Sequence, residues 1–504
     1  MNRSRLPTWA RGGLWLVVFW LAALATHASG LYQPMHCDYS CRLRVARDWR
    51  QGLALYRQTY DNPNPVVFLW LLAIDSPRPA VSGFLAETAL AAGAGLFLWA
   101  ALARAVPRLA GVVPLVLIAL SGASPTFYGG QIAEAPAMWL DVIAVAALWL
   151  ALEGGGLALA ALAGAAGVLV VALRFPAVLH VAAWLPLVVL HPGSRREQVR
   201  VVTAAALGAC AALAAFVAHA QWFGYWHEFW VVFRRNLSYG ALDRVPLADS
   251  VVAALKTLAR IALANSLVVL LAVVAVAMTW SLRGRLRVRE RAWLAASVVW
   301  LAAAIAGAFP GGRHYAHYYH LIWPPLAVGL LLWLPPLARL ARRGALVDRL
   351  AAAIAAGTLL VAVLLEGWRG AQAVRDLHAG RHPWNETTAA AEWLEQHTTR
   401  DTPVLVHVWL DWAELYWRVP RPAPSLAIPH VVPRDLFGEF LQTTEQEMPA
   451  WIVWDGTPWE PIDGPLADET LLAARDRFVT RLERDYAERQ RIGTLRILQR
   501  KNAR

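Results

Sequence analysis

The chain has 504 residues, 58% of them hydrophobic, and its mean hydropathy is +0.41. Long apolar runs recur along it, and several reach the roughly 20 residues that a helix needs to cross a bilayer, which excludes an ordinary soluble protein. The formal net charge is +12, but much of the arginine lies in short connections between apolar runs and no nucleic-acid-binding motif accompanies it, so no nucleic-acid partner is expected. These features predict a polytopic α-helical membrane protein.

About eleven membrane-spanning helices are predicted. The first runs from Leu14 to about Ala28 after a basic start, and we expect it to be retained rather than cleaved as a signal peptide. The other apolar runs lie at 80–103, 107–122, 135–152, 157–173, 176–190, 199–219, 257–282, 293–309, 319–338 and 349–367.

The arginines predict which connections lie on which side of the membrane. If the connections alternate and the N-terminus is inside, the inside ones are basic, including one with five arginines between 283 and 291. The exception is the turn that begins at Glu153. Because positive charge is retained inside, this pattern puts the N-terminus in the cytoplasm and the C-terminal region outside. The Ala- and Arg-rich composition fits a bacterial inner membrane.

The character of the sequence changes near residue 368, so we predict a transmembrane domain over 1–367 and an extracytoplasmic soluble α/β domain over 368–504. The second part is charged and has no spanning run. Alternation and length predict strands at Thr402–Trp409, Pro449–Trp454 and Thr494–Gln499, and helices at Asp411–Val419 and Leu471–Arg491.

The first outer loop, residues 30–65, is the main candidate for a functional segment. Connectors this long are uncommon and are usually functional or disordered. Helical spacing from Asp38 to Leu55 and several aromatic residues predict that it is ordered on the membrane surface and presents Asp38. Alternatively, Asp38 only caps the helix that follows. Cys37 and Cys41 form a disulfide or are simply two small helix residues.

The other candidate residues fall on the same predicted face. Gln131 and Glu134 lie in the second outer loop, Arg174 precedes Pro176, and a later loop contains Arg313, His317 and Tyr318. Charges at membrane depth are costly and usually mark function. Each residue also has a simpler interpretation, such as a helix cap for Glu134 or an interface anchor for Arg174.

The residue types suit displacement of a phosphate leaving group. Asp38 and Glu134 can accept a proton or orient a hydroxyl, whereas Arg174, Arg313 and His317 can bind a phosphate. No nucleotide pool exists outside a cell membrane. An activated substrate there is therefore expected to be carried by a lipid phosphate.

In their order, these motifs resemble the GT-C glycosyltransferases, in particular the protein mannosyltransferase and aminoarabinose transferase-like group (glycosyltransferase family 39-like). The resemblance rests on motifs that follow one another along nearly the whole chain: Asp38, Gly52 with Tyr56, Asp61 before Pro63 and Pro65, Glu134 before Pro136, Arg174 before Pro176, and the basic, Tyr-rich segment from Arg313 to Pro325. This chain departs from the group at Tyr39, where many members have a second acid, which leaves open whether a divalent metal ion takes part.

The resemblance implies a GT-C-like fold and transfer of a sugar from a polyprenyl-phosphate donor, with inversion, to a lipid, glycan or protein acceptor. It implies catalytic roles for Asp38 and Glu134. The substrate-binding residues that it implies are Tyr56, Asp61, Gln131, Arg174, Arg313, His317 and Tyr318. The alternative functions are a transporter or flippase, or a non-catalytic binder, of lipid-linked sugars.

Overall fold

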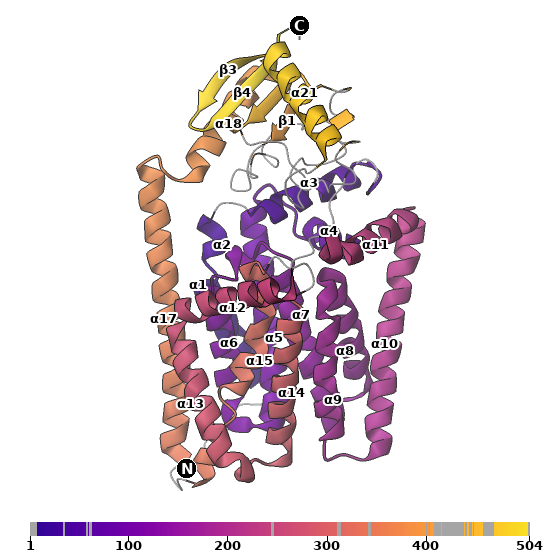
Figure 1. Ribbon diagram of the computed structural model, residues 1–504. Helices are drawn as coiled ribbons and strands as arrows, with labels where there is room; N and C mark the ends of the chain where they lie inside the picture. Colours follow the sequence, from indigo (N-terminus) through magenta and orange to yellow (C-terminus); the bar gives the residue numbers. More distant parts are fainter. Residues whose placement is uncertain are drawn as a thin grey trace. The chain divides into compact units, whose positions relative to one another are not determined.

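The computed structural model describes residues 8–33, 36–56, 59, 63–242, 246–309, 314–340, 344–399, 402, 404–407, 415, 438, 441–442, 446, 448–456 and 468–501. The chain divides into two compact units. Figure 1 labels the helices and strands that belong to them. The first unit is Met1–Leu31, Arg78–His219 and Val245–Gly370. The second unit is Tyr32–Pro77, Ala220–Arg244 and Ala371–Arg504.

The first unit is a bundle of apolar helices. Its main elements are α1 (Thr8–Thr26), α2 (Ser29–Tyr32), α5 (Pro79–Ala105), α6 (Val112–Ala123), η2 (Tyr128–Gly130), α7 (Glu134–Leu150), η3 (Ala151–Gly155), α8 (Leu157–Leu173), η4 (Phe175–Ala183), α9 (Trp184–Val189), α10 (Arg195–Trp222), α12 (Leu247–Ala264), α13 (Ser266–Leu282), η5 (Arg283–Arg285), α14 (Val288–Ala306), η6 (Ala316–Ile322), α15 (Trp323–Gly329), α16 (Leu334–Leu340) and α17 (Gly344–His378). In the described part of the chain, six helices are long and apolar enough to cross a membrane, and four shorter apolar helices accompany them. Helices occupy every predicted apolar run, which confirms the polytopic class.

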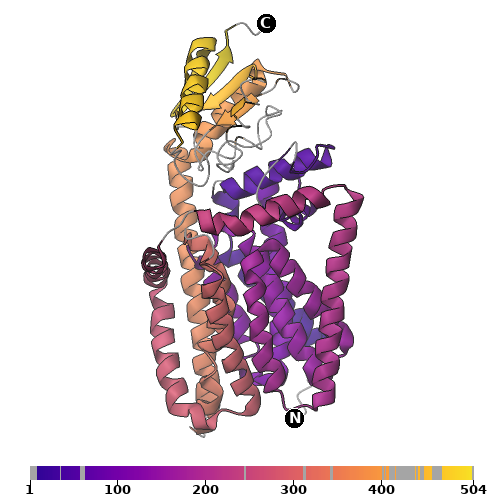
Figure 2. The same ribbon diagram turned by 45° about the vertical axis from the view of Figure 1, so that its right-hand side comes forward.

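One predicted span is two helices. The run at 257–282 is interrupted at Asn265, whose backbone is not helical (φ −129°, ψ 54°). Its side-chain Nδ2 donates to the Ile261 carbonyl at 2.8 Å and closes the preceding turn. In Figure 1, α12 lies crosswise to α13, and in Figure 2 it is seen nearly end-on.

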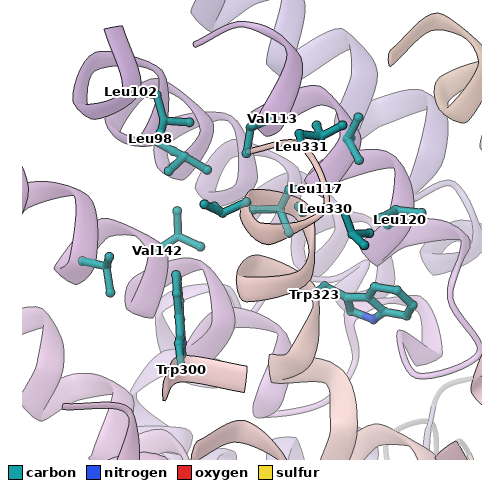
Figure 3. Packing of buried hydrophobic residues seen from close by; sticks show 14 of the residues in the cluster. Leu98, Leu102, Val113, Leu117, Leu120, Val142, Trp300, Trp323, Leu330 and Leu331 are labelled. Carbon is teal, nitrogen blue, oxygen red and sulfur yellow. The ribbon is translucent and has the colours of Figure 1, made fainter. Parts of the chain in front are cut away.

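The core of the first unit is built from large side chains on several helices (Figure 3). Leu98 of α5, Leu117 of α6 and Leu330 after α15 belong to one buried cluster. Trp300 and Trp323 are each only 1% exposed in this cluster. Indole rings bury a large area and still carry an N–H donor, so they need polar partners inside the bundle.

Small residues bring α8 and α10 into backbone contact. A Cβ added at Gly164 would lie 1.8 Å from the Ala205 carbonyl oxygen. A Cβ added at Gly208 would lie 2.0 Å from the Ala161 carbonyl oxygen. Close approach of this kind is how small residues pack apolar helices together in lipid.

Glu153 lies in the predicted inside connection that is not basic, and its carboxylate is paired with Arg289 of the five-arginine connection. Arg289 Nε lies 2.8 Å from Glu153 Oε1, and His191 Nε2 lies 3.4 Å from the same oxygen. Nearby, Arg339 and Glu290 form a second ion pair at 2.6 Å. These contacts join connections that the arginine pattern predicts on one side of the membrane.

The long helix α17 is linked to the start of the chain. Glu366 is 2% exposed, and its Oε2 accepts from the Ser29 backbone N–H at 2.7 Å. Arg369 Nη1 lies 2.6 Å from Glu366 Oε1, and its Nη2 donates to the Ala123 carbonyl at 3.0 Å. The last helix of the unit thus closes the connection after α1 and the end of α6.

The second unit combines short helices with a four-stranded mixed sheet. Its helices are α3 (Cys37–Arg50), α4 (Pro65–Ala73), α11 (Trp226–Leu242), α18 (Pro383–His397) and α21 (Glu469–Asp485). Its strands are β1 (Val404–His407), β2 (Trp451–Trp454), β3 (Tyr486–Ile492) and β4 (Leu495–Arg500), in the order β1-β2-β4-β3. Strands β1 and β2 are parallel, and the other pairs are antiparallel.

The sheet confirms the predicted mixture of strands and helices, with one error. The predicted helix Leu471–Arg491 is wrong in its last part, because α21 ends at Asp485 and the chain continues as β3. The predicted helix Asp411–Val419 lies outside the described residues except for Leu415.

Candidate functional site

A buried ion pair forms the centre of the candidate site in the first unit. Arg174 Nη1 lies 3.2 Å from Glu134 Oε1, with side-chain exposures of 19% and 4%. The guanidinium carbon also lies 4.1 Å from the ring centroid of Tyr318. A carboxylate and an aromatic face therefore fix the guanidinium from two directions.

Aromatic rings extend this centre. The rings of His317 and Tyr318 meet edge to face with centroids 4.7 Å apart. Tyr128 meets His317 edge to face at 5.4 Å, and Tyr315 stacks on His317 at 5.6 Å. We call Tyr128, Glu134, Arg174, His317 and Tyr318 the Arg174 cluster. Its members come from three connections far apart in sequence, and sequence analysis predicted four of them as site residues.

Local sequence accounts for the turn that carries Tyr128. Tyr128, Gly129 and Gly130 have φ values of 48°, 66° and 75°. Two consecutive glycines make this left-handed path accessible, whereas at Tyr128 it is strained. A Cβ at Gly130 would also lie 3.0 Å from Glu87 Cγ. The turn leads into α7, where Glu134 occupies the first turn and its negative charge suits the helix N-terminus.

His314 anchors the connection that carries His317 and Tyr318. Its Nε2 lies 2.7 Å from Ser250 Oγ, and its Nδ1 lies 2.7 Å from the Tyr319 hydroxyl. Thr257 Oγ1 donates to the His314 carbonyl at 3.0 Å. Burial lowers the pKa of His314, so the neutral imidazole is favoured between these hydroxyl groups. Through this residue α12 holds the connection in place.

Sequence analysis missed a second buried pair. His180 Nδ1 of η4 lies 2.5 Å from Asp141 Oδ2 of α7, and Trp300 Nε1 of α14 donates to the same oxygen at 2.7 Å. Glu87 of α5 is also buried and accepts from Trp139 Nε1 at 2.5 Å. The sequence signal for these residues is the presence of ionisable side chains inside apolar runs, where charge is costly. A single residue of this kind does not reveal its partner, because the partner lies on another helix.

Asp38 lies in the second unit, in the first turn of α3. The alternative that Asp38 caps this helix is wrong, because the N-cap is His36, whose Nδ1 accepts from the Asp38 backbone N–H at 3.3 Å. The Asp38 carboxylate lies 2.8 Å from Arg42 Nη2, four residues along the helix. Asp48 makes the equivalent contact with Arg44 at 2.6 Å.

The remaining predicted residues are in varied surroundings. Tyr56 has a left-handed backbone (φ 67°), and its hydroxyl donates to the Pro63 carbonyl at 2.6 Å. Gln131 is buried beside the Tyr128 turn, its backbone N–H donating to the Tyr128 carbonyl at 3.3 Å. Asp61, Arg313 and the Cys37 side chain lie outside the described residues.

The metal prediction stays open. Within the described ranges, no three His, Cys, Asp or Glu side chains are grouped so that they could hold a metal ion. Asp61 lies outside these ranges.

The arrangement is suited to binding an oxyanion. A guanidinium carries five N–H donors in one plane, and a bidentate contact with a phosphate uses two of them. Glu134 occupies one edge of the Arg174 guanidinium and Tyr318 one face. These two contacts fix the orientation in which the remaining N–H groups can meet an anion.

The fold and this site define the chain as a polytopic membrane protein with a small mixed-sheet region. No protein-family model matches the sequence, and the search of curated proteins gave no match. Among solved structures, the chain is similar to ArnT from Cupriavidus metallidurans bound to undecaprenyl phosphate, with a TM-score of 0.53 and 13% identity over 96% of this chain and 97% of that one. The Archaeoglobus fulgidus oligosaccharyltransferase complex with Zn and sulfate gives a TM-score of 0.49 and 13% identity, over 88% and 68%. The chain thus has an ArnT-like fold.

Proposed function

We propose that the chain is an integral membrane glycosyltransferase of the GT-C type. It transfers a sugar from a polyprenyl-phosphate donor to a lipid, glycan or protein acceptor, with inversion at the sugar. The observation that carries the proposal is the Arg174 cluster, in which an oriented guanidinium meets a carboxylate and aromatic residues from two other connections.

The nature of the donor follows from the fold and from the charge of the cluster. ArnT was solved bound to undecaprenyl phosphate, and the two chains match over nearly their full lengths. A phosphate on a lipid needs a cation at the end of an apolar bundle, and Arg174 ends the apolar helix α8. This supports a polyprenyl phosphate as the ligand of this chain, and we assign its phosphate to Arg174.

The proposed reaction needs one base and one phosphate-binding group. Asp38 takes the proton of the acceptor hydroxyl. The hydroxyl oxygen of the acceptor attacks the anomeric carbon of the sugar from the face opposite the phosphate. The bond between sugar and acceptor forms as the sugar–phosphate bond breaks, and the electron pair of the broken bond leaves with the lipid phosphate. Arg174, Arg313 and His317 stabilise the phosphate. Glu134 contributes by orienting the Arg174 guanidinium, with which it is paired.

The proposal includes a location and a division of the chain. The N-terminus and the five-arginine connection lie in the cytoplasm of a bacterial inner membrane, and the sheet lies outside. Residues 1–367 form the transmembrane domain that includes the first outer loop, and residues 368–504 form the extracytoplasmic domain.

A transporter or flippase for lipid-linked sugars is the second candidate. The observation that favours it is the presence of Asp141 and His180 inside apolar segments, since such residues often line transport pathways. Each is satisfied by the other and by Trp300, however, which also fits a static structural link.

The test measures sugar transfer by the purified full chain, using a radiolabelled polyprenyl-phosphate sugar and a membrane-lipid extract as acceptor. Asp38→Asn should lower the rate at least about a hundredfold, as expected for loss of a general base. Asp48→Asn is the matched control, because Asp48 lies in the same helix and makes the same type of ion pair. Equal activity of Asp38→Asn and wild type would exclude Asp38 as the base, and donor binding without transfer by wild type would favour the second candidate.

A further inference from the structure

Two polar side-chain pairs connect α7 to the segment formed by Arg174 and η4, at two positions along α7. On α7, Glu134 and Asp141 are seven residues apart, which is two α-helical turns, or about 10 Å, on one face. Across from them, Arg174 is the extended N-cap of η4 (φ −143°, ψ 94°), and His180 lies within η4, six residues further along the chain. Glu134 pairs with Arg174 at 3.2 Å, and Asp141 pairs with His180 at 2.5 Å.

The Asp141–His180 pair is better buried than the Glu134–Arg174 pair. The side chains of His180 and Asp141 are 3% and 5% exposed, and Trp300 is 1% exposed. If His180 Nδ1 donates to Asp141, it cannot also accept from Trp300, so the indole N–H donates to the carboxylate. Asp141 Oδ2 then receives two donors, one from η4 and one from α14. Removing one member of such a set leaves a buried polar group without compensation.

The segment η4 needs an external support to keep its register. Its 3₁₀ hydrogen bonds have poorer geometry than those of an α-helix. Each residue of a 3₁₀ helix turns the chain by about 120°. Arg174 is the N-cap of η4, so a rotation of η4 would carry Arg174 with it, away from Glu134. The contact with Asp141 fixes η4 at His180, six residues beyond Arg174.

We propose that Asp141 and His180 are positioning residues for the phosphate-binding guanidinium of Arg174. They set the rotation and register of η4, and thereby the edge of Arg174 that faces a lipid phosphate. This inference rests on the proposed function, because it assigns the pair a role in the affinity for the donor lipid. A purely structural link would stabilise the bundle without acting through Arg174.

A double-mutant cycle separates these two roles. The affinity of the purified full chain for undecaprenyl phosphate is measured for wild type, Asp141→Asn, Arg174→Gln and the double variant. We expect Asp141→Asn to weaken binding at least about fivefold when Arg174 is present and less than twofold when it is replaced, because coupled residues are not additive. Glu290→Gln, in a buried pair with Arg339 near the other end of α14, should leave the affinity unchanged.

The outcomes distinguish the inference from the function on which it rests. Equal losses in both backgrounds would overturn the positioning role and leave the proposed function standing. Failure of wild type to bind undecaprenyl phosphate would instead overturn the proposed donor. Trp300→Phe runs in the same cycle, because it removes one donor to Asp141 while keeping most of the ring's packing. Trp300→Phe should also weaken binding of undecaprenyl phosphate more when Arg174 is present than when it is replaced, with a smaller loss than Asp141→Asn. This comparison still tests the positioning role if Asp141→Asn does not fold.

Discussion

Arg174 is held by two interactions of unequal strength. A cation over an aromatic face contributes about 0.5–2 kcal/mol, and this part comes from Tyr318. Breaking a buried ion pair by removing one partner costs about 3–5 kcal/mol, and this part comes from Glu134. Loss of Glu134 should therefore disturb the cluster more than loss of Tyr318, and the role that we propose for this carboxylate acts through Arg174.

A second residue-scale consequence concerns His314 and pH. Burial lowers the pKa of His314 in the folded protein below the roughly 6.5 of an unfolded chain. As the pH falls through that unfolded value, the unfolded state takes up a proton first, so the free energy of unfolding decreases with a slope of up to about 1.4 kcal/mol per pH unit. The thermal midpoint in detergent between pH 8 and 5 should therefore fall, and His314→Gln should reduce the slope.

Exposed His378 provides the control for this pH effect. His378→Gln should leave the slope as it is in wild type, because its ring is not enclosed by hydroxyl partners as His314 is. An unchanged slope in His314→Gln would show that another group governs the acid sensitivity.

At the scale of elements, the crossing of α8 and α10 depends on the absence of side chains. Gly164→Ala should lower the free energy of unfolding by about 1–3 kcal/mol, the usual cost of overpacking, because its Cβ would overlap the Ala205 carbonyl. The midpoint of thermal unfolding measures this effect.

Gly167, in the same helix, is the matched control for Gly164. A Cβ at Gly167 meets only the Trp184 ring, at 3.4 Å, which is an ordinary contact. Gly167→Ala should be neutral or stabilising by up to about 1 kcal/mol, since alanine is the better helix former. Equal destabilisation by both variants would mean that the close crossing does not govern stability.

Sequence predicted the helices well where an apolar run was uninterrupted, and less well where a polar residue had a specific structural role. Asn265 ends α12 through its own side chain, and hydropathy does not register a single polar residue in such a run. The strand β3 was predicted as helix because it is the edge strand and carries charged side chains such as Glu488 and Arg491. Strand propensity is weakly expressed in such a segment.

At the scale of the whole molecule, the class of protein could be predicted from sequence, and so could the proximity of four members of the Arg174 cluster. Their positions at the ends of apolar runs indicated this proximity, because connections at one end of a bundle meet there. Their role in a site stays a prediction. The Asp141–His180 pair could not be found in that way, since its members lie inside the apolar runs. The role of Asp38 remains a prediction that only activity can test.

The proposed topology can be tested on the full chain. In a variant in which Cys37, Cys41 and Cys210 are replaced by alanine, single cysteines are introduced as Gly284→Cys and Arg381→Cys, both at exposed positions. A membrane-impermeant maleimide should label Arg381→Cys in spheroplasts and Gly284→Cys only in inside-out vesicles, because the five-arginine connection stays in the cytoplasm. Labelling of both introduced cysteines from the same side would exclude the proposed odd number of membrane crossings between residues 284 and 381.

The link between Ser29 and Glu366 has a consequence for biosynthesis. The two residues are 337 positions apart, and at roughly 5–20 residues per second the ribosome needs about 20–70 s to make the chain between them. During that interval the connection after α1 has already been synthesised, but the Glu366 carboxylate that accepts from the Ser29 backbone N–H does not yet exist. This early segment is therefore among the last to reach its final structure, and the membrane unit completes its folding only once α17 has been synthesised.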